Sequence, residues 1–85
     1  MFLAKVFVTL KPTVNDPQGL TVLGALKTLG FESVASVRLG KYLEVQVNES
    51  ERSQAEAQVS EMCRKLLANP VIEEFSYQLE ELASV

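Results

Sequence analysis

The side chains that most often carry out chemistry in proteins are scarce in this sequence. Its 85 residues include no histidine and a single cysteine, Cys63. Without histidine the commonest general base is missing, and so are the Ser-His and Cys-His arrangements of nucleophilic catalysis. One thiol with scattered carboxylates does not make a zinc site either. We therefore expect no catalytic residue and no metal site in this chain.

The lone thiol is better explained as part of the core. Cys63 recurs at helical spacing with Val59 and Leu66 on the apolar stripe of a predicted helix. Free cysteine is among the most buried residue types, whereas a reactive thiol needs an exposed, electropositive setting. Arg64 and Lys65 are adjacent but point elsewhere on the helix. We expect a core role for Cys63.

The acidic residues also have structural explanations. Asp16 precedes Pro17 where a helix N-cap is expected, and Glu56 completes a capping box that begins at Ser53. Other glutamates are expected to carry solvated charge, namely Glu49, Glu51, Glu80 and Glu81. No dinucleotide or phosphate-loop pattern occurs. The sequence thus favours structural roles for these carboxylates over an acid–base pair.

Composition places the chain among globular proteins of one domain, residues 1–85. Hydrophobic residues make up 47% and charged residues 22%, and the net charge is −3. That charge, without a basic stripe, argues against nucleic acid as a partner. We see no signal-peptide pattern and no apolar run of ~18 residues, so we expect a cytoplasmic protein with no membrane partner. So short a chain has a small core, which favours oligomerisation.

Residues 2–11 alternate as a strand that Pro12 ends. Its first apolar face is Phe2, Ala4, Val6, Val8 and Leu10. A helix should follow, from the N-cap Asp16 to a left-handed cap at Gly30. The apolar stripe of that helix is Val22, Leu23, Ala25, Leu26 and Leu29.

Residues 34–47 predict two strands around Gly40. The apolar side chains of both strands face the same side of the sheet only if the loop between them has an odd number of residues. Arg38-Leu39-Gly40 supplies such a loop, with glycine in the left-handed position. A second helix should begin at the Ser53 capping box and stop at Asn69-Pro70. Its apolar positions are Ala55, Val59, Met62, Cys63 and Leu66, and a last strand follows with Phe75, Tyr77 and Leu79.

The predicted order is βαββαβ, an α+β fold. Such a chain can form a four-stranded antiparallel sheet with both helices on one face, the ferredoxin-like arrangement. The other sheet face would then be bare, and its mixed composition is typical of a subunit interface. The residues expected there are Leu3, Phe7, Tyr42 and Ile72, mixed with Arg38, Glu44 and Glu74. We expect the first four to form a homodimer interface.

Five blocks of sequence, in order and spread from end to end, carry a resemblance. They are Val8-Thr9-Leu10-Lys11-Pro12, Asp16-Pro17-Gln18-Gly19, Leu29-Gly30-Phe31, Val37-Arg38-Leu39-Gly40-Lys41-Tyr42 and Cys63-Arg64-Lys65-Leu66-Leu67-Ala68-Asn69-Pro70-Val71-Ile72-Glu73. Together they closely resemble the PurS family, the small subunit of phosphoribosylformylglycinamidine synthase. Thr13, where a glycine is common, and Gly24 depart from the usual pattern but lie outside the blocks.

The resemblance implies a role within a larger enzyme. In this family a large subunit binds ATP and formylglycinamide ribonucleotide and performs the amidation, and a glutaminase subunit releases ammonia from glutamine. The small subunit is a dimer needed for the complex to form, in the fourth step of de novo purine biosynthesis. The resemblance also implies that it helps ammonia transfer between the two sites. We therefore expect no cofactor on this chain, although the complex uses ATP and magnesium.

The same resemblance gives candidate partner-contact residues. Those at matching positions are Lys11, Pro12, Asp16, Gln18, Gly19, Arg38, Gly40, Lys41, Tyr42, Asn69 and Pro70. The prolines and glycines also fit turns, and Asp16 and Asn69 fit helix caps. A long polar side chain near a turn adds little stability. We therefore expect Lys11, Arg38, Lys41 and Tyr42 in particular to contact partner subunits.

Other classes of function remain open at the level of sequence. The chief alternative is a dimeric ferredoxin-like regulatory module that binds a small molecule at its interface, which the fold alone does not exclude. A small enzyme with a carboxylate pair across a dimer would show turnover without partners. An RNA-binding sheet would need basic residues that this acidic chain lacks.

Overall fold

The computed structural model describes residues 1–82 of the chain. Within them the elements are β1 (Phe2–Leu10), α1 (Pro17–Thr28), β2 (Gly40–Val47), α2 (Arg52–Met62), the π-helical turn η1 (Cys63–Leu67) and β3 (Glu73–Glu81). The strands of this described part form an antiparallel sheet of three, in the order β2-β1-β3. The α+β class and the two helices were predicted correctly, whereas the predicted fourth strand is not found there.

The core lies between the sheet and α2. Val6, at the centre of β1, pairs with Leu43 on β2 and Tyr77 on β3. The alternation of β1 was predicted correctly, because Phe2, Ala4, Val6 and Val8 are buried while Leu10 is half-buried. Helix α2 covers this face with Ala55, Val59 and Cys63, which have no exposed surface.

The predicted core role of Cys63 is confirmed. Its side chain is fully buried beneath the sheet, and this burial raises the pKa of the Cys63 thiol. A raised pKa keeps the thiol protonated at neutral pH, which is the opposite of what a nucleophilic cysteine requires.

The predicted hairpin around Gly40 is wrong. Residues 34–39 form no strand, and Gly40 instead begins β2, opposite Thr9 of β1. Gly40 is outside the left-handed region. A Cβ atom there would lie 2.5 Å from the carbonyl oxygen of Val8, so the absence of a side chain permits close approach to β1 rather than a turn.

The ends of α1 are those predicted. Asp16 is the N-cap, and its side chain accepts a hydrogen bond from the Gly19 N–H at 2.9 Å. Gly30 has φ 101°. The Gly30 N–H donates to the Lys27 carbonyl and the Phe31 N–H donates to the Leu26 carbonyl. This pattern is the Schellman motif.

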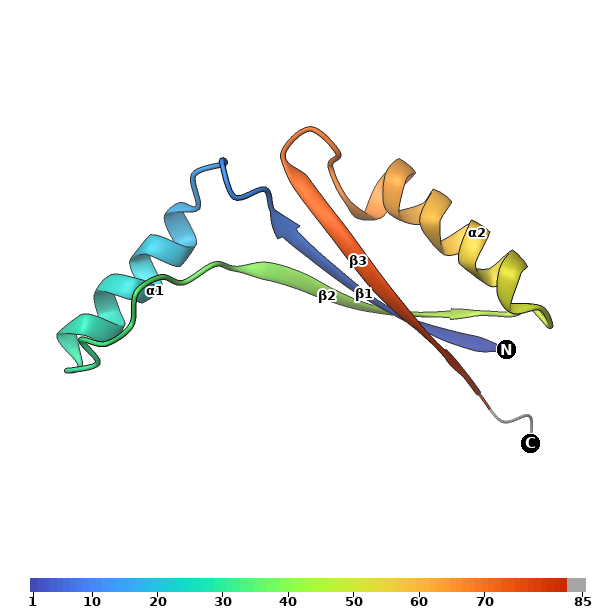
Figure 1. The fold of residues 1–85 in the computed structure, drawn as a ribbon, viewed down its shortest axis with the longest axis horizontal. Helices are drawn as coiled ribbons and strands as arrows, with labels where there is room; N and C mark the ends of the chain where they lie inside the picture. The colour runs from blue at the N-terminus through green and yellow to red at the C-terminus, as the bar shows by residue number, and fades with distance from the viewer. Residues whose placement is uncertain (83–85) are drawn as a thin grey trace.

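The predicted packing of α1 on the sheet is wrong. Within α1 the buried residue is Gly19, and Leu29 at its end is 73% exposed. Figure 1 shows α1 at the left, projecting beyond the end of the sheet where β1 ends and β2 begins, while α2 lies at the right. The radius of gyration is 16.6 Å, against roughly 12 Å for a compact domain of this length. We call α1 and the returning residues 29–39 the arm.

The second helix begins and ends differently from the prediction. Its N-cap is Glu51, which makes no side-chain capping bond, so the predicted capping box of Ser53 and Glu56 is wrong. At the other end η1 winds more loosely than an α-helix, which shifts the residues that face the core. Ala68 is therefore buried, while Leu66 is 83% exposed.

The two glycines of α1 provide a test of how the arm is held. A methyl group on Gly19 would collide with the Val37 carbonyl oxygen, whereas the corresponding position on Gly24 has open space. We expect Gly19→Ala to lower the free energy of unfolding by about 1–3 kcal/mol, the usual cost of overpacking. Gly24→Ala should raise it by up to about 1 kcal/mol through helix propensity. Urea unfolding measures both, and equal effects would contradict this packing.

Candidate functional site

Several of the predicted contact residues meet where the arm joins the sheet. The end of β1, the start of α1, the start of β2 and the start of β3 surround a cleft of about 260 Å³, which we call the junction cleft. It is lined by Val8, Leu10, Asp16, Gln18, Leu39, Gly40, Lys41 and Glu73. Four predicted contact residues that are far apart in sequence therefore lie around one cleft: Asp16, Gln18, Gly40 and Lys41.

Asp16 connects the two chain segments at the base of the arm. It is 4% exposed. One carboxylate oxygen accepts from the Gly19 N–H, and the other accepts from the Leu39 N–H at 2.8 Å. The hydrogen bonds from Leu39 and Gly19, followed by the charge of Arg38, lower the pKa of Asp16. The carboxylate thus holds the start of α1 against the segment that enters β2.

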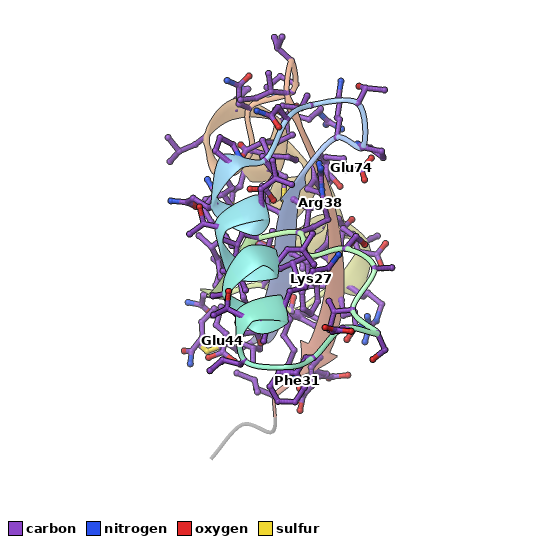
Figure 2. The ribbon with its side chains drawn as sticks, turned by 90° about the vertical axis from the view of Figure 1, so that its left-hand side faces the viewer. Lys27, Phe31, Arg38, Glu44 and Glu74 are labelled. Carbon is purple, nitrogen blue, oxygen red and sulfur yellow. The ribbon has the colours of Figure 1, made fainter. Side chains whose placement is uncertain are left out.

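Arg38 secures the same junction from the other side. Its Nη2 atom donates to the backbone carbonyls of Lys11 at 2.9 Å, Val14 at 3.1 Å and Leu10 at 3.4 Å. Figure 2 places Arg38 toward the junction end of the arm and Phe31 toward its far end. Arg38 therefore has a folding role that sequence reasoning missed, because its acceptors lie 24 to 28 residues away.

The ammonium group of Lys41 is exposed to solvent at the junction cleft. Its Nζ lies 3.6 Å from Glu73 Oε2, and the lysine side chain is 59% exposed while that of Glu73 is 16% exposed. Glu73 also accepts from the Asn69 N–H at 2.7 Å. Glu73 was absent from the predicted contact residues, although the sequence block that ends at position 73 contains it.

The remaining predicted residues near this end shape loops. The side chain of Asn69 accepts from the Val71 N–H at 3.1 Å, which forms the turn containing Pro70 and leading into β3. The Lys11 N–H donates to the Ile72 carbonyl at 2.8 Å. Pro12 is exposed in the next loop. Their contacts with partner subunits stay a prediction.

Tyr42 lies on the opposite side of the sheet, outside the junction cleft. It pairs with Phe7, with ring centroids 5.1 Å apart, and its hydroxyl donates to Glu44 at 2.9 Å. Burial, with Glu44 as the second cause, raises the pKa of Tyr42. Leu3 and Phe7 share this face by the register of β1.

Two residues assigned to that face lie elsewhere. Arg38 is outside the sheet, so its predicted place on the bare face is wrong. Ile72 precedes β3 and is partly exposed. The homodimer interface of Leu3, Phe7, Tyr42 and Ile72 stays a prediction.

Both carboxylates of the junction, Asp16 and Glu73, accept hydrogen bonds from backbone N–H groups. Residues 1–82 contain no cluster of three or more metal-ligating side chains. In the same described stretch, no helix has the length and apolarity needed to cross a membrane.

The fold and junction define a class of small α+β protein, in which a three-stranded antiparallel sheet carries an uncovered helical arm. The family described as "PurS: Phosphoribosylformylglycinamidine (FGAM) synthase" matches residues 3–81. The chain belongs to the PurS family, the small subunit of FGAM synthase in purine biosynthesis.

Individual relatives agree with this assignment over nearly the whole chain. The PurS subunit of Bacillus subtilis is 45% identical over 84 residues, which is 99% of each chain. The crystal structure of Methanocaldococcus jannaschii PurS has a TM-score of 0.87 at 37% identity, covering 98% of this chain and 100% of that one. A chain of the structure titled PurLQS from Thermotoga maritima has a TM-score of 0.84 at 28% identity, covering 94% and 99%.

The hydrogen bonds of Asp16 predict a pH dependence of stability. A carboxylate whose pKa is lowered by folding stabilises the fold above its ordinary pKa of 3.8, and this is lost as the pH falls through the lowered value. Asparagine does not titrate and turns an N–H donor toward one of the two backbone donors. We expect Asp16→Asn to melt below wild type at neutral pH, with the difference shrinking on acidification.

Thermal unfolding followed by circular dichroism across this pH range measures that difference. Glu32→Gln, which removes an exposed carboxylate from the same arm, is the matched control. A difference between wild type and Asp16→Asn that stays constant, or grows, as the pH falls would contradict the role assigned to the Asp16 carboxylate.

Proposed function

We propose that this chain is a non-catalytic assembly subunit, which holds the large ATP-dependent amidating subunit and the glutaminase subunit of FGAM synthase together. The observation that carries the proposal is the uncovered arm. In a chain of 85 residues, a helix that leaves the sheet gives up core contacts that a small domain can scarcely spare. A second protein that covers the arm supplies those contacts.

The arm exposes apolar surface along its length. Its exposed large apolar side chains are Leu20, Val22, Leu29, Phe31 and Leu39. Fully burying one such side chain gains about 1.5–3 kcal/mol, so burying several gives an assembly a substantial driving force. Several large apolar side chains exposed on one short segment favour contact with another protein.

A second copy of the chain is the proposed first partner. The arm of one protomer would pack against the other in a twofold arrangement, the commonest symmetry of soluble homo-oligomers. In that arrangement the junction cleft, with Lys41 on its rim, remains available to the two larger subunits. ATP and magnesium would act on the large subunit, and the assembly would work in the cytoplasm, where an unpaired cysteine such as Cys63 is stable.

The junction cleft gives the regulatory alternative little support. The junction cleft has a volume of about 260 Å³, below the range of ~300–1,000 Å³ typical of small-molecule pockets. Its acidic side chains are occupied by intramolecular contacts. A ligand that raised the melting temperature of the isolated chain would revive this alternative.

Reconstitution tests the assembly role. The chain is mixed with the large synthase subunit and the glutaminase, and amidation is followed with glutamine or with free ammonia as the nitrogen source. We expect glutamine-dependent activity to need the chain, because it depends on both subunits being held together, and ammonia-dependent activity to need it less. Equal glutamine-dependent rates without the chain would contradict the proposal.

A variant pair sharpens that assay. Lys41→Gln removes the exposed cation of the junction, whereas Lys65→Gln removes one from η1, where Lys65 pairs with Glu61 at 3.4 Å. We expect Lys41→Gln to raise the concentration of chain needed for half-maximal activity several-fold. Lys65→Gln should behave as wild type, and equal behaviour of the two variants would exclude the junction as a contact.

Sedimentation equilibrium tests the dimer. A protomer has a mass of 9.4 kDa, and we expect wild type to sediment at twice that value or more. Leu29→Glu places a charge on the exposed apolar end of the arm and should shift the population toward monomer. Lys27→Gln, which changes the net charge by the same amount on the same arm, should not. A monomeric wild type at all concentrations would contradict the twofold proposal.

A further inference from the structure

The sheet face opposite α2 is acidic with an aromatic centre. Its side chains alternate with those of the core, so α2 does not cover it. We call it the open face. It consists of Leu3, Lys5, Phe7, Thr9, Tyr42, Glu44, Gln46, Glu74, Ser76, Gln78 and Glu80. Its three carboxylates and one amine give it a formal charge of −2.

Some charged side chains of the open face already have a partner within residues 1–82, and one does not. Lys5 Nζ lies 3.1 Å from Glu80 Oε2, and Glu44 accepts a hydrogen bond from the Tyr42 hydroxyl. Among the described residues, Glu74 has no ion-pair partner and no side-chain hydrogen bond. Its side chain is exposed, so it can take a cation from another molecule without breaking an existing contact.

Glu74 borders a hollow beside the aromatic pair. The hollow has a volume of about 190 Å³ and is lined by Phe7, Thr9, Glu74, Phe75 and Ser76. Phe7 is 40% exposed and forms one wall, with Tyr42 packed behind it. An aromatic wall and a carboxylate on one small hollow are complementary to a planar cation. Such a cation can lie on the ring while its N–H groups bond the carboxylate.

We propose that an arginine side chain from a partner subunit of the synthase occupies this hollow, with its guanidinium on the Phe7 ring and paired with Glu74. The proposal rests on the proposed assembly function and names the chemistry of one of its contacts. The chain already contains such a stacking on its other face, where the Arg52 guanidinium lies 5.4 Å from the centroid of the Phe2 ring. Arginine is also enriched at interface cores and among energetic hot spots.

Charge favours a different protein over a second copy on this face. A twofold pairing of open faces would oppose two surfaces of the same negative sign, and like charges across an interface are unfavourable. Lys5 does not offset this, because Glu80 already pairs with it. Phe7 and Tyr42 are thereby assigned to a contact with a larger subunit, in place of the homodimer interface predicted from the sequence.

The test measures binding of the full chain to the purified large subunit and to the purified glutaminase by isothermal titration calorimetry. Glu74→Gln removes the proposed charge pair, and Phe7→Leu removes the ring while keeping an apolar side chain. The matched control is Glu81→Gln, since Glu81 is exposed on the same strand but in register with Phe2, on the opposite face. Melting temperature and sedimentation show whether each variant folds and self-associates as wild type does.

We expect Glu74→Gln to weaken binding to one of the two subunits by about tenfold or more, the effect of losing a hydrogen-bonded charge pair. Phe7→Leu should weaken the same interaction, the salt dependence should decrease in Glu74→Gln, and Glu81→Gln should bind as wild type. Unchanged binding of Glu74→Gln, with wild type binding normally, would overturn this inference and leave the assembly function intact.

Two other outcomes also decide the matter. If Glu74→Gln or Phe7→Leu dissociates the homodimer and leaves binding to the larger subunits unaffected, a second copy covers the open face and the inference is wrong. If wild type binds neither larger subunit, both the inference and the assembly function are wrong.

Discussion

The structure depends on the carboxylate of Asp16, which ties two chain segments 23 residues apart. One oxygen caps α1 and the other binds the backbone N–H of Leu39. Arg38 reinforces this tie through the carbonyls of the loop after β1. Together these bonds fix the direction in which the arm leaves the sheet and the point at which β2 begins. They satisfy backbone groups that would otherwise need a neighbouring strand, and so they take the place of the expected hairpin.

An arm held in this way leaves an apolar helix uncovered. The core formed by β1 and α2 is small and closed, whereas the apolar side of α1 lacks a covering layer within the described chain. The molecule extends 50 Å in one direction and 14 Å in another, so most of its surface is accessible to other proteins. This geometry gives a physical reason why so small a subunit can serve a larger enzyme. A thin, two-ended scaffold can contact more than one larger protein at a time.

Local patterns predicted those parts of the fold that are fixed locally. The alternation of β1, the capping of α1 by Asp16 and Gly30, and the burial of Cys63 each depend on residues within a few positions. Sequence could not show that α1 lacks a surface to pack on, because an apolar stripe does not identify what covers it. The π-helical turn moved Leu66 outward by breaking the regular spacing. The prediction that Asp16 and Lys41 belong to one set of contact residues came from family resemblance. The folding role of Arg38 could not be predicted locally, because its hydrogen bonds join residues far apart in sequence.

Amide hydrogen exchange along α1 tests most directly whether another chain completes the arm. Exchange is measured in the chain at high dilution and in the chain mixed with the large subunit and the glutaminase. The account predicts that α1 exchanges rapidly in the dilute chain and slows by orders of magnitude in the mixture, while the central amides of β1 are protected in both. An arm as strongly protected as β1 in the dilute chain, or equally labile in the mixture, would contradict it.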